Sequence, residues 1–223
     1  MPISTSQLLA DIRPLLASLA KDAQQSNATW DLFEVLTFGL VARAARDAGA
    51  TVDFLDTSGS KATRYLFRSS PGPLANPGQN FIHAEIRFDS LPPLEAHNGI
   101  WIIGKSLLPH ECDCVVLRKD EADAVRASGR SPLWGAVLLH AECKYYAQPI
   151  PFWQGRNFLG LSLDLGWKGG VLLMNRKKAT VSQLVGSRKR SALRLQPGNS
   201  VDRQVVAGLL RRRFLRYERT GDV

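Results

Sequence analysis

Two stretches of sequence decide the expected fold, HECDCVVL at residues 110–117 and LLHAECK at residues 138–144. Both have the length and the apolar content of a buried β-strand. Because side chains two residues apart lie on the same face of a strand, Glu142 and Lys144 point to one side of the sheet. If the two strands pair, Asp113 and Glu142 can converge on one cation. The sequence therefore predicts an ionic site where two neighbouring strands meet.

The residue types at this predicted site favour a hard divalent cation. Asp113 and Glu142 supply carboxylate oxygens, and the backbone carbonyl of Cys143 can supply a third oxygen. An all-oxygen set is typical of Mg²⁺, with Mn²⁺ as the alternative, rather than of zinc. Lys144 would then lie beside the attacking water or the negative charge that develops on phosphorus. Hydrolysis of a phosphodiester bond requires these parts.

Periodicity along the chain predicts an α/β fold in a single domain, residues 1–223, with a core at residues 29–175 and a basic extension at 176–223. The extension is expected to be helical. The expected elements, in order, are helices at 8–19 and 30–48, strands at 63–68, 81–88, 100–103 and 112–117, a short helix at 119–130, a strand at 135–145, a helix through Phe158, a strand at 171–174 and a last helix at 201–217.

This combination resembles the PD-(D/E)xK nuclease superfamily, which is also called restriction-endonuclease-like. The core of that superfamily is a helix, three strands, a helix and a strand, with an acidic metal ligand and Glu-x-Lys on adjacent strands. Asp113 in HECDCVVL and Glu142-Cys143-Lys144 in LLHAECK match these motifs. The resemblance implies that Asp113 and Glu142 bind the metal and that Lys144 is catalytic. It also implies a restriction-endonuclease-like core and a homodimer.

A fourth candidate, Glu34, lies on the predicted helix at residues 30–48. It is the only charged residue between Leu32 and Ala42. An unpaired buried carboxylate is costly, and a metal ion or a lysine would offset that cost. Many members of the superfamily carry a glutamate on the first core helix, so the resemblance implies that Glu34 assists catalysis by binding the metal or a water molecule.

Positive charge is concentrated near the end of the chain. Thirteen lysines and arginines lie between residues 176 and 219 against only Asp202 and Glu218, so this segment carries +11 and the remainder −2 of a net +9. Such asymmetry favours binding to a polyanion, most directly DNA, with RNA not excluded. The expected nucleic-acid contacts are Arg156, Arg188, Lys189, Arg190, Arg211 and Arg212.

Three other patterns have alternative interpretations. The Glu-x-Arg motif at residues 85–87 is a rival to Glu142-x-Lys144, but arginine cannot deprotonate and no partner acid is as well placed. His140 shares the predicted active face and serves either phosphate or metal binding or a structural hydrogen bond. The cysteines could bind zinc, although a role as small buried apolar residues is favoured. They are Cys112, Cys114 and Cys143.

Composition narrows the class of protein. The chain has no run of 18 apolar residues and no secretory signal pattern, and its odd cysteine count argues against a disulfide framework. We expect a soluble cytoplasmic protein without membrane contact. The predicted function is metal-dependent hydrolysis of DNA phosphodiester bonds, in defence against foreign DNA or in repair and recombination. The alternative is a non-catalytic nucleic-acid-binding module with the same fold.

Overall fold

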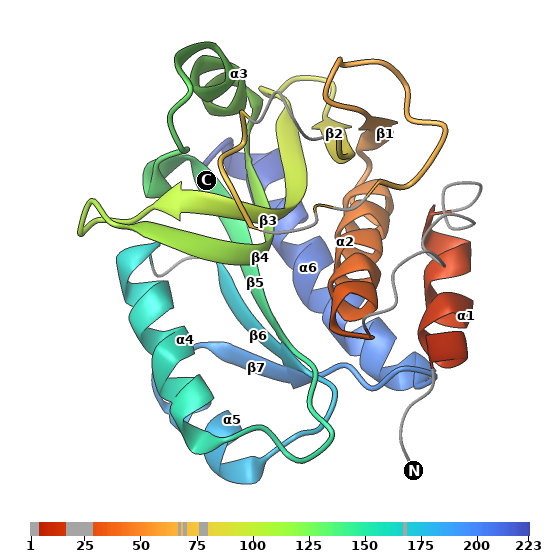
Figure 1. The fold of residues 1–223 in the computed structure, drawn as a ribbon, viewed down its shortest axis with the longest axis vertical. Coiled ribbons are helices and arrows are strands. Elements are labelled where there is room, and N and C mark those ends of the chain that lie inside the picture. The colour runs from red at the N-terminus through yellow and green to blue at the C-terminus, as the bar shows by residue number, and fades with distance from the viewer. Residues whose placement is uncertain (1–4, 17–28, 67, 69–70, 76–79, 167–168) are drawn as a thin grey trace.

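The computed structural model describes residues 5–16, 29–66, 68, 71–75, 80–166 and 169–223 (Figure 1). The chain is α/β, as predicted, and is built on a seven-stranded mixed sheet. In chain order the elements are α1 (Thr5–Leu16), α2 (Thr29–Asp47), β1 (Thr51–Leu55), β2 (His83–Arg87), β3 (Leu94–Ile103), β4 (Pro109–Arg118), α3 (Lys119–Ser128), the 3₁₀ turn η2 (Trp134–Ala136), β5 (Val137–Lys144), α4 (Phe152–Asp164), β6 (Gly170–Met174), α5 (Ala179–Ser187), β7 (Ser191–Arg194) and α6 (Ser200–Thr220).

The strands lie in the sheet in the order in which they follow one another along the chain. Strands β1 to β5 pair antiparallel, whereas β5, β6 and β7 pair parallel. Parallel neighbours need crossover connections, and α4 and α5 supply them. The pairing therefore changes from antiparallel to parallel at β5, the strand that carries the Glu-x-Lys motif.

Helices cover both faces of this sheet (Figure 1). On one face, α1, α2 and α6 share an apolar core with strand residues that include Cys114, Ala141 and Cys143. On the other face, Phe158 of α4 and Val181 of α5 pack with Leu172 of β6. Within the described ranges no helix is both long enough and apolar enough to cross a bilayer.

The predicted strand at residues 63–68 is wrong for its described part, because residues 63–66 and 68 form no strand. The edge strand is instead β1, which follows α2 after Gly49 and pairs Thr51 with Arg87. Tyr65 is buried and its ring lies 6.0 Å from that of Phe38, so its apolar character serves packing on α2 rather than strand pairing. The end of the predicted N-terminal helix, Leu19, lies outside the described residues.

The C-terminal extension contains more than the predicted helix. The short strand β7 adds to the sheet beside β6, and α5 precedes it. The expectation of a purely helical extension is therefore wrong, because the four residues of β7 are too few for alternation to be recognised among the surrounding arginines. The predicted helix at 119–130 corresponds to α3, which ends at a left-handed Gly129.

Helices α1 and α2 approach each other closely at Gly39, where an added Cβ would lie 2.9 Å from the Cβ of Leu15. We predict that Gly39→Ala lowers the free energy of unfolding by about 1–3 kcal/mol, because overpacking outweighs the gain in helix propensity. Gly160→Ala on α4 is the matched control, since a Cβ there meets nothing within 4 Å. It should raise stability by up to about 1 kcal/mol. Urea denaturation followed by circular dichroism compares them, and a Gly39→Ala midpoint at or above that of the wild type would contradict the prediction.

Candidate active site

Asp113 lies on β4 and its carboxylate points toward β5. The residue is 6% exposed, and its Oδ2 accepts a hydrogen bond of 2.6 Å from the backbone N–H of Cys143. The ladder between the two strands pairs Cys114 with Ala141, and continuing this register sets Asp113 beside Glu142. The Asp113 carboxylate thus joins β4 to β5 just beyond their last backbone pair.

Lys144 connects the two predicted metal ligands. Its Nζ lies 2.5 Å from Oε1 of Glu142 and 3.4 Å from Oδ2 of Asp113. Burial alone would lower the pKa of Lys144, but the carboxylates of Asp113 and Glu142 outweigh it and hold the pKa above its ordinary value. The ammonium group is therefore charged at neutral pH and bridges side chains from two strands.

The acidic members of the site carry raised pKa values. Burial raises the pKa of Glu142, the negative charge of Asp113 adds to this, and the pKa reaches about 7 in spite of Lys144. Burial also raises the pKa of Asp113, although Lys144 and the Cys143 amide oppose it. Glu142 therefore exchanges its proton near neutral pH, which an exposed glutamate does not do.

Glu34 faces this group from α2. Its pKa is raised to about 9, first by burial and then by the negative charges of Asp113, Asp31 and Glu111, while Lys144 lowers it. Glu34 is therefore within electrostatic range of Asp113 and Lys144, the same two residues that act on Glu142. Glu111, which the sequence pattern places on the face of Asp113, also belongs to this group.

A hydrogen-bonded chain fixes α2 against the motif strand. The thiol of Cys143 donates to Oγ1 of Thr37 at 3.3 Å, and Thr37 in turn donates to the carbonyl of Phe33 at 3.0 Å. The ring of Phe33 lies 5.6 Å from that of Tyr145, directly after the Glu-x-Lys motif. Because these contacts flank Glu34 on the helix, they determine how closely Glu34 approaches β5.

The site has a donor set that fits a hard cation only in part. Within the described part of the chain, no three His, Cys, Asp or Glu side chains form a group that could hold a metal ion. Proteins often bind Mg²⁺ through one or two carboxylates, with water and substrate oxygens completing the shell. Asp113 and Glu142 supply such a pair, and their raised pKa values show that a further positive charge would be favourable there.

The structure gathers some of the predicted nucleic-acid contacts and leaves others apart. Arg190 and Arg212 lie near Arg213, which was not among the expected contacts, and Arg216, which shares with Arg212 the basic face expected for the last helix, lies near Arg213 as well. Burial lowers the pKa of Arg213, and repulsion from the other three lowers it further. We call these four residues the arginine cluster. Their mutual repulsion would be relieved by a bound polyanion.

The other four predicted contacts have separate surroundings. Arg188 and Lys189 are exposed at the end of α5. Arg211 donates from Nε to the backbone carbonyl of Asp47 at 2.8 Å, and the guanidinium of Arg156 lies 5.0 Å from the ring centroid of Phe152. Arg211 therefore has a structural contact that the sequence did not indicate.

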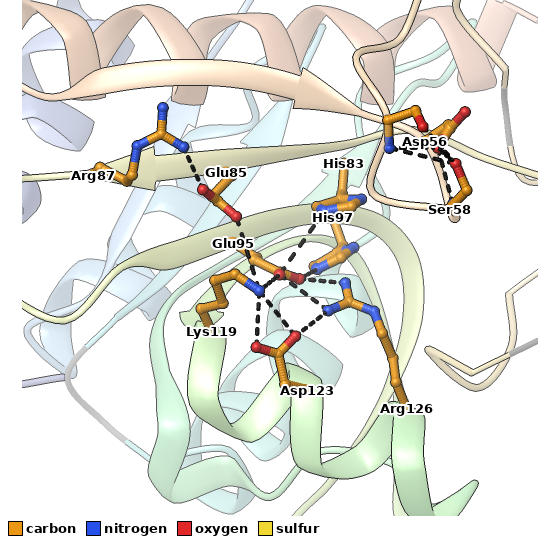
Figure 2. Close-up of polar contacts among 11 residues, drawn as sticks. Asp56, Ser58, His83, Glu85, Arg87, Glu95, His97, Lys119, Asp123 and Arg126 are labelled. Atoms are coloured by element: carbon orange, nitrogen blue, oxygen red, sulfur yellow. Dashed lines mark hydrogen bonds and ion pairs between the residues drawn. The ribbon is translucent and has the colours of Figure 1, made fainter.

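The rival Glu-x-Arg motif at residues 85–87 belongs to an ion-pair network (Figure 2). Arg87 pairs with both Glu85 and Asp53 along the edge of the sheet. Lys119 of α3 lies 3.8 Å from Glu85 and 3.5 Å from Glu95. Because Glu85 has cationic partners on two sides, we infer that the residues of the Glu-x-Arg motif stabilise the structure. This favours Glu142-x-Lys144 as the candidate site for chemistry.

Glu95 lies at the centre of the network in Figure 2 and is fully buried. It accepts hydrogen bonds from Nε2 of His97 at 2.9 Å and from both terminal nitrogens of Arg126 at 3.0 and 2.5 Å. Burial alone would raise the pKa of Glu95, but these bonds outweigh it and hold the pKa below its ordinary range. The cluster joins α3 to β3, a contact that no short-range spacing in the sequence reveals.

The three cysteines are free and buried. Cys114 and Cys143 belong to the core beneath α2, whereas Cys112 belongs to a separate apolar cluster. The predicted role as small apolar residues agrees with this burial.

No protein-family model matches the chain, and neither the curated proteins nor the solved structures give a significant match. What the site does must therefore be argued from its own geometry.

The raised pKa of Glu34 makes stability depend on pH. Between its ordinary value of 4.5 and about 9, the folded protein keeps a proton that the unfolded chain has lost, so wild-type stability falls as the pH rises through this window. The amide that replaces the carboxyl group in Glu34→Gln does not ionise in this pH range. We predict that the variant gains stability relative to the wild type between about pH 5 and pH 9, in urea titrations without divalent metal.

Glu218→Gln, at an exposed position on α6, is the matched control for loss of one carboxyl group. Its stability should follow the wild type across the same range. A difference between Glu34→Gln and wild type that does not change with pH would show that the pKa of Glu34 is not raised in the folded protein.

Proposed function

We propose that this protein is a metal-dependent nuclease that hydrolyses phosphodiester bonds in DNA. One observation carries the proposal: the ammonium group of Lys144 bridges Glu142 and the buried Asp113 from a neighbouring strand. An ordinary ion pair at the surface needs one carboxylate for one lysine. Burying a second carboxylate beside that lysine costs desolvation free energy. Buried carboxylates whose negative charge exceeds the positive charge of the neighbouring lysine are typical of a site that binds another cation.

The order of the elements supports a restriction-endonuclease-like core of the PD-(D/E)xK type. With β1 and β2 added after α2, and with α3 and η2 inserted between β4 and β5, helix α2, strands β3, β4 and β5, helix α4 and strand β6 follow the order helix, three strands, helix, strand. Asp113 and the Glu142-x-Lys144 motif lie on the adjacent strands β4 and β5. Glu34 on α2 corresponds to the glutamate that many members carry on the first core helix.

In the proposed site, Asp113 and Glu142 would hold Mg²⁺ or Mn²⁺, with the carbonyl of Cys143 as a third oxygen and Glu34 assisting. The ion would supply polarisation of the phosphate and a more acidic bound water. Lys144, which stays protonated, would stabilise the negative charge that develops on the phosphate oxygens. Glu142, with a pKa of about 7, could release its proton at neutral pH when a second cation arrives.

The arginine cluster supports DNA as the substrate, because Arg190, just before β7, and two arginines of α6 lie close enough to Arg213 to lower its pKa. RNA offers the same phosphates, so the cluster alone does not distinguish the two nucleic acids. Assembly as a homodimer and a role in defence or in repair and recombination remain predictions of the resemblance.

A non-catalytic nucleic-acid-binding module is the second candidate. It is favoured by the finding that, among the described residues, no three potential ligand side chains are grouped for a metal ion. In that case Lys144 would serve only to neutralise Asp113 and Glu142. The two candidates differ in turnover and in the dependence on divalent metal.

Cleavage assays on linear, circular, single-stranded and branched DNA test the enzyme proposal. We predict cleavage of at least one substrate with Mg²⁺ or Mn²⁺ and none with chelator. Lys144→Ala, Asp113→Asn and Glu142→Gln should each slow cleavage about 100-fold or more, because each removes charge on which the transition state depends. Glu85→Gln is the matched control for Glu142→Gln, since Glu85 lies in the rival motif, and it should keep wild-type activity. Metal-independent binding without cleavage of any substrate would favour the second candidate.

The arginine cluster predicts how DNA affinity responds to salt. Arg212→Gln combined with Arg216→Gln should weaken binding and reduce the slope of log affinity against log salt by about 2, since each phosphate contact contributes about 0.9. Arg43→Gln combined with Arg130→Gln removes the same charge from exposed positions outside the cluster. An equal loss in both double variants, measured by fluorescence anisotropy in chelator, would mean that the cluster is not the DNA surface.

A further inference from the structure

The candidate site shares one edge of the sheet with the start of α4 and of α5. Strands β5 and β6 run parallel, and their register pairs Lys144 with Met174. Helix α4 follows β5 and begins at Phe152, and α5 follows β6 and begins at Ala179, so both helices start on the side where the two strands end (Figure 1). We call this side, at the carboxyl ends of β5 and β6, the carboxyl edge.

The arginine cluster begins nearer the other end of these strands. Arg190 directly precedes β7, whose first residue, Ser191, pairs with Val171 and is therefore level with Ala141 on β5. Three residues separate Ala141 from Lys144, which is roughly 10 Å along the strand. Nucleic acid bound beside Lys144 would therefore contact residues of the carboxyl edge as well as the arginine cluster.

Two neighbouring aromatic side chains are exposed at the carboxyl edge, where α4 begins. Trp153 is 54% exposed and Phe152 is 37% exposed. The guanidinium of Arg156, one helical turn further on, lies 5.0 Å from the centroid of the Phe152 ring. Rings of this size are covered in most folded proteins, so adjacent exposed ones are typical of a binding surface.

A buried hydrogen-bond network holds the start of α4 against the end of β5. The side chain of Asn175, 3% exposed, accepts from the backbone N–H of Tyr146 and donates to its carbonyl, each at 2.9 Å. The backbone N–H of Asn175 donates to the carbonyl of Lys144 at 3.3 Å. Gln154, 8% exposed, donates from Nε2 to the hydroxyl of Tyr146 at 2.5 Å. The exposed ring of Trp153 therefore stands on a fixed base that also contacts Lys144.

The charge of this part of the chain is almost entirely positive. Residues 145–201 contain nine lysines and arginines and a single acid, Asp164, which is the last residue of α4. Lys177, between β6 and α5, is exposed. Burial raises the pKa of Tyr145, and the nearby charge of Arg176 opposes that rise. The carboxyl edge is therefore complementary in charge to a polyanion.

Exposed aromatic rings among basic side chains fit a strand with unpaired bases better than a duplex. In a duplex the faces of the bases are stacked on one another, so an exposed indole reaches only base edges and phosphates. A single strand presents the face of each base to an aromatic ring while basic side chains follow its phosphates. An acidic protein would match the charge of the carboxyl edge but would offer no series of planar groups to Trp153 and Phe152.

We propose that the carboxyl edge binds single-stranded DNA, with an unpaired base stacked on Trp153 and phosphates held by Arg156 and Lys177. This inference rests on the proposed function, because it names the class of DNA that the site would receive. Strand ends, flaps and branched DNA supply unpaired bases, whereas a fully paired duplex does not. Duplex DNA is therefore the poorer ligand and the poorer substrate.

Fluorescence anisotropy in chelator compares the full-length wild type with Trp153→Leu and with the matched control Trp134→Leu. Trp134 is also exposed, at 39%, and also has a cation beside it, since Nζ of Lys105 lies 4.7 Å from its ring centroid. It belongs to η2, however, at the opposite end of β5 from Lys144. The probes are a labelled single strand, the same strand in a duplex, and a strand with abasic sites in place of its bases.

We expect the wild type to bind the single strand more tightly than the duplex. Trp153→Leu should weaken single-strand binding about 10-fold, the usual effect of losing one stacking partner, and Trp134→Leu should leave it unchanged. The abasic strand should bind the wild type and Trp153→Leu equally, because it keeps its phosphates but has no base to stack. Equal binding of that strand also shows that the variant has folded.

The phosphate contacts are tested by Arg156→Gln combined with Lys177→Gln. This double variant should reduce the slope of log affinity against log salt by about 1.4 on the single strand, since each phosphate contact contributes about 0.7 there. Arg43→Gln combined with Arg130→Gln again removes the same charge from exposed positions elsewhere and should leave the slope unchanged.

Equal affinity for single strand and duplex, or equal losses in Trp153→Leu and Trp134→Leu, would overturn the single-strand proposal. Tighter binding of polyglutamate than of the single strand would assign the carboxyl edge to an acidic protein and would also overturn it. Metal-dependent cleavage of duplex DNA that Trp153→Leu does not change would leave the nuclease proposal standing without this one. Single-strand binding that depends on Trp153, with no cleavage of any DNA, would do the reverse.

Discussion

Burial of the Asp113 carboxylate between two strands is the constraint on which the candidate site depends. A carboxylate with so little access to water requires both a hydrogen bond and a nearby positive charge. The amide of Cys143 supplies the first and Lys144 supplies the second, and both belong to β5. Lys144 can reach Asp113 only by lying across Glu142, so the burial of one residue on β4 determines the arrangement of two on β5.

A second buried carboxylate shows what full compensation looks like. Glu95 receives hydrogen bonds from His97 and Arg126, and its pKa is held low. Asp113, although similarly buried, has a raised pKa because its partners do not offset its desolvation. The protein therefore neutralises one internal acid completely and leaves the other short of positive charge. Such a difference between two comparable groups makes Asp113 a candidate functional group, which burial alone would not do.

The sequence predicted which side chains meet at the candidate site, but it did not predict everything around them. Alternation along two apolar strands was enough to bring Glu142 and Lys144 to Asp113, because the two-residue period of a strand leaves little freedom. Glu34 was identifiable as a lone charge on an apolar helix. The grouping of Arg190 with Arg213 could not be predicted, since these two residues meet through the packing of α6 and have no spacing in common.

The strands at the two edges escaped prediction for a related reason. Five residues in β1 and four in β7 contain too few alternations to stand out, and strand-like composition at residues 63–68 competed with β1. Which of two such segments joins the sheet is decided by tertiary packing. The contact of Glu95 with α3 is likewise non-local, and only the folded chain brings Arg126 to it.

The connection from β4 to β5 limits where residues can be inserted between the two strands of the candidate site. Residues 119–136 separate the two strands of the site, and doubling a flexible loop costs only about 0.6 kcal/mol in closure entropy. Yet α3 carries Arg126, and Leu133 is tied by its amide to Glu121, so neither end of the connection is free. Tolerance to inserted residues is therefore confined to the exposed stretch at Gly129 and Arg130, where the chain can lengthen without separating Asp113 from Glu142.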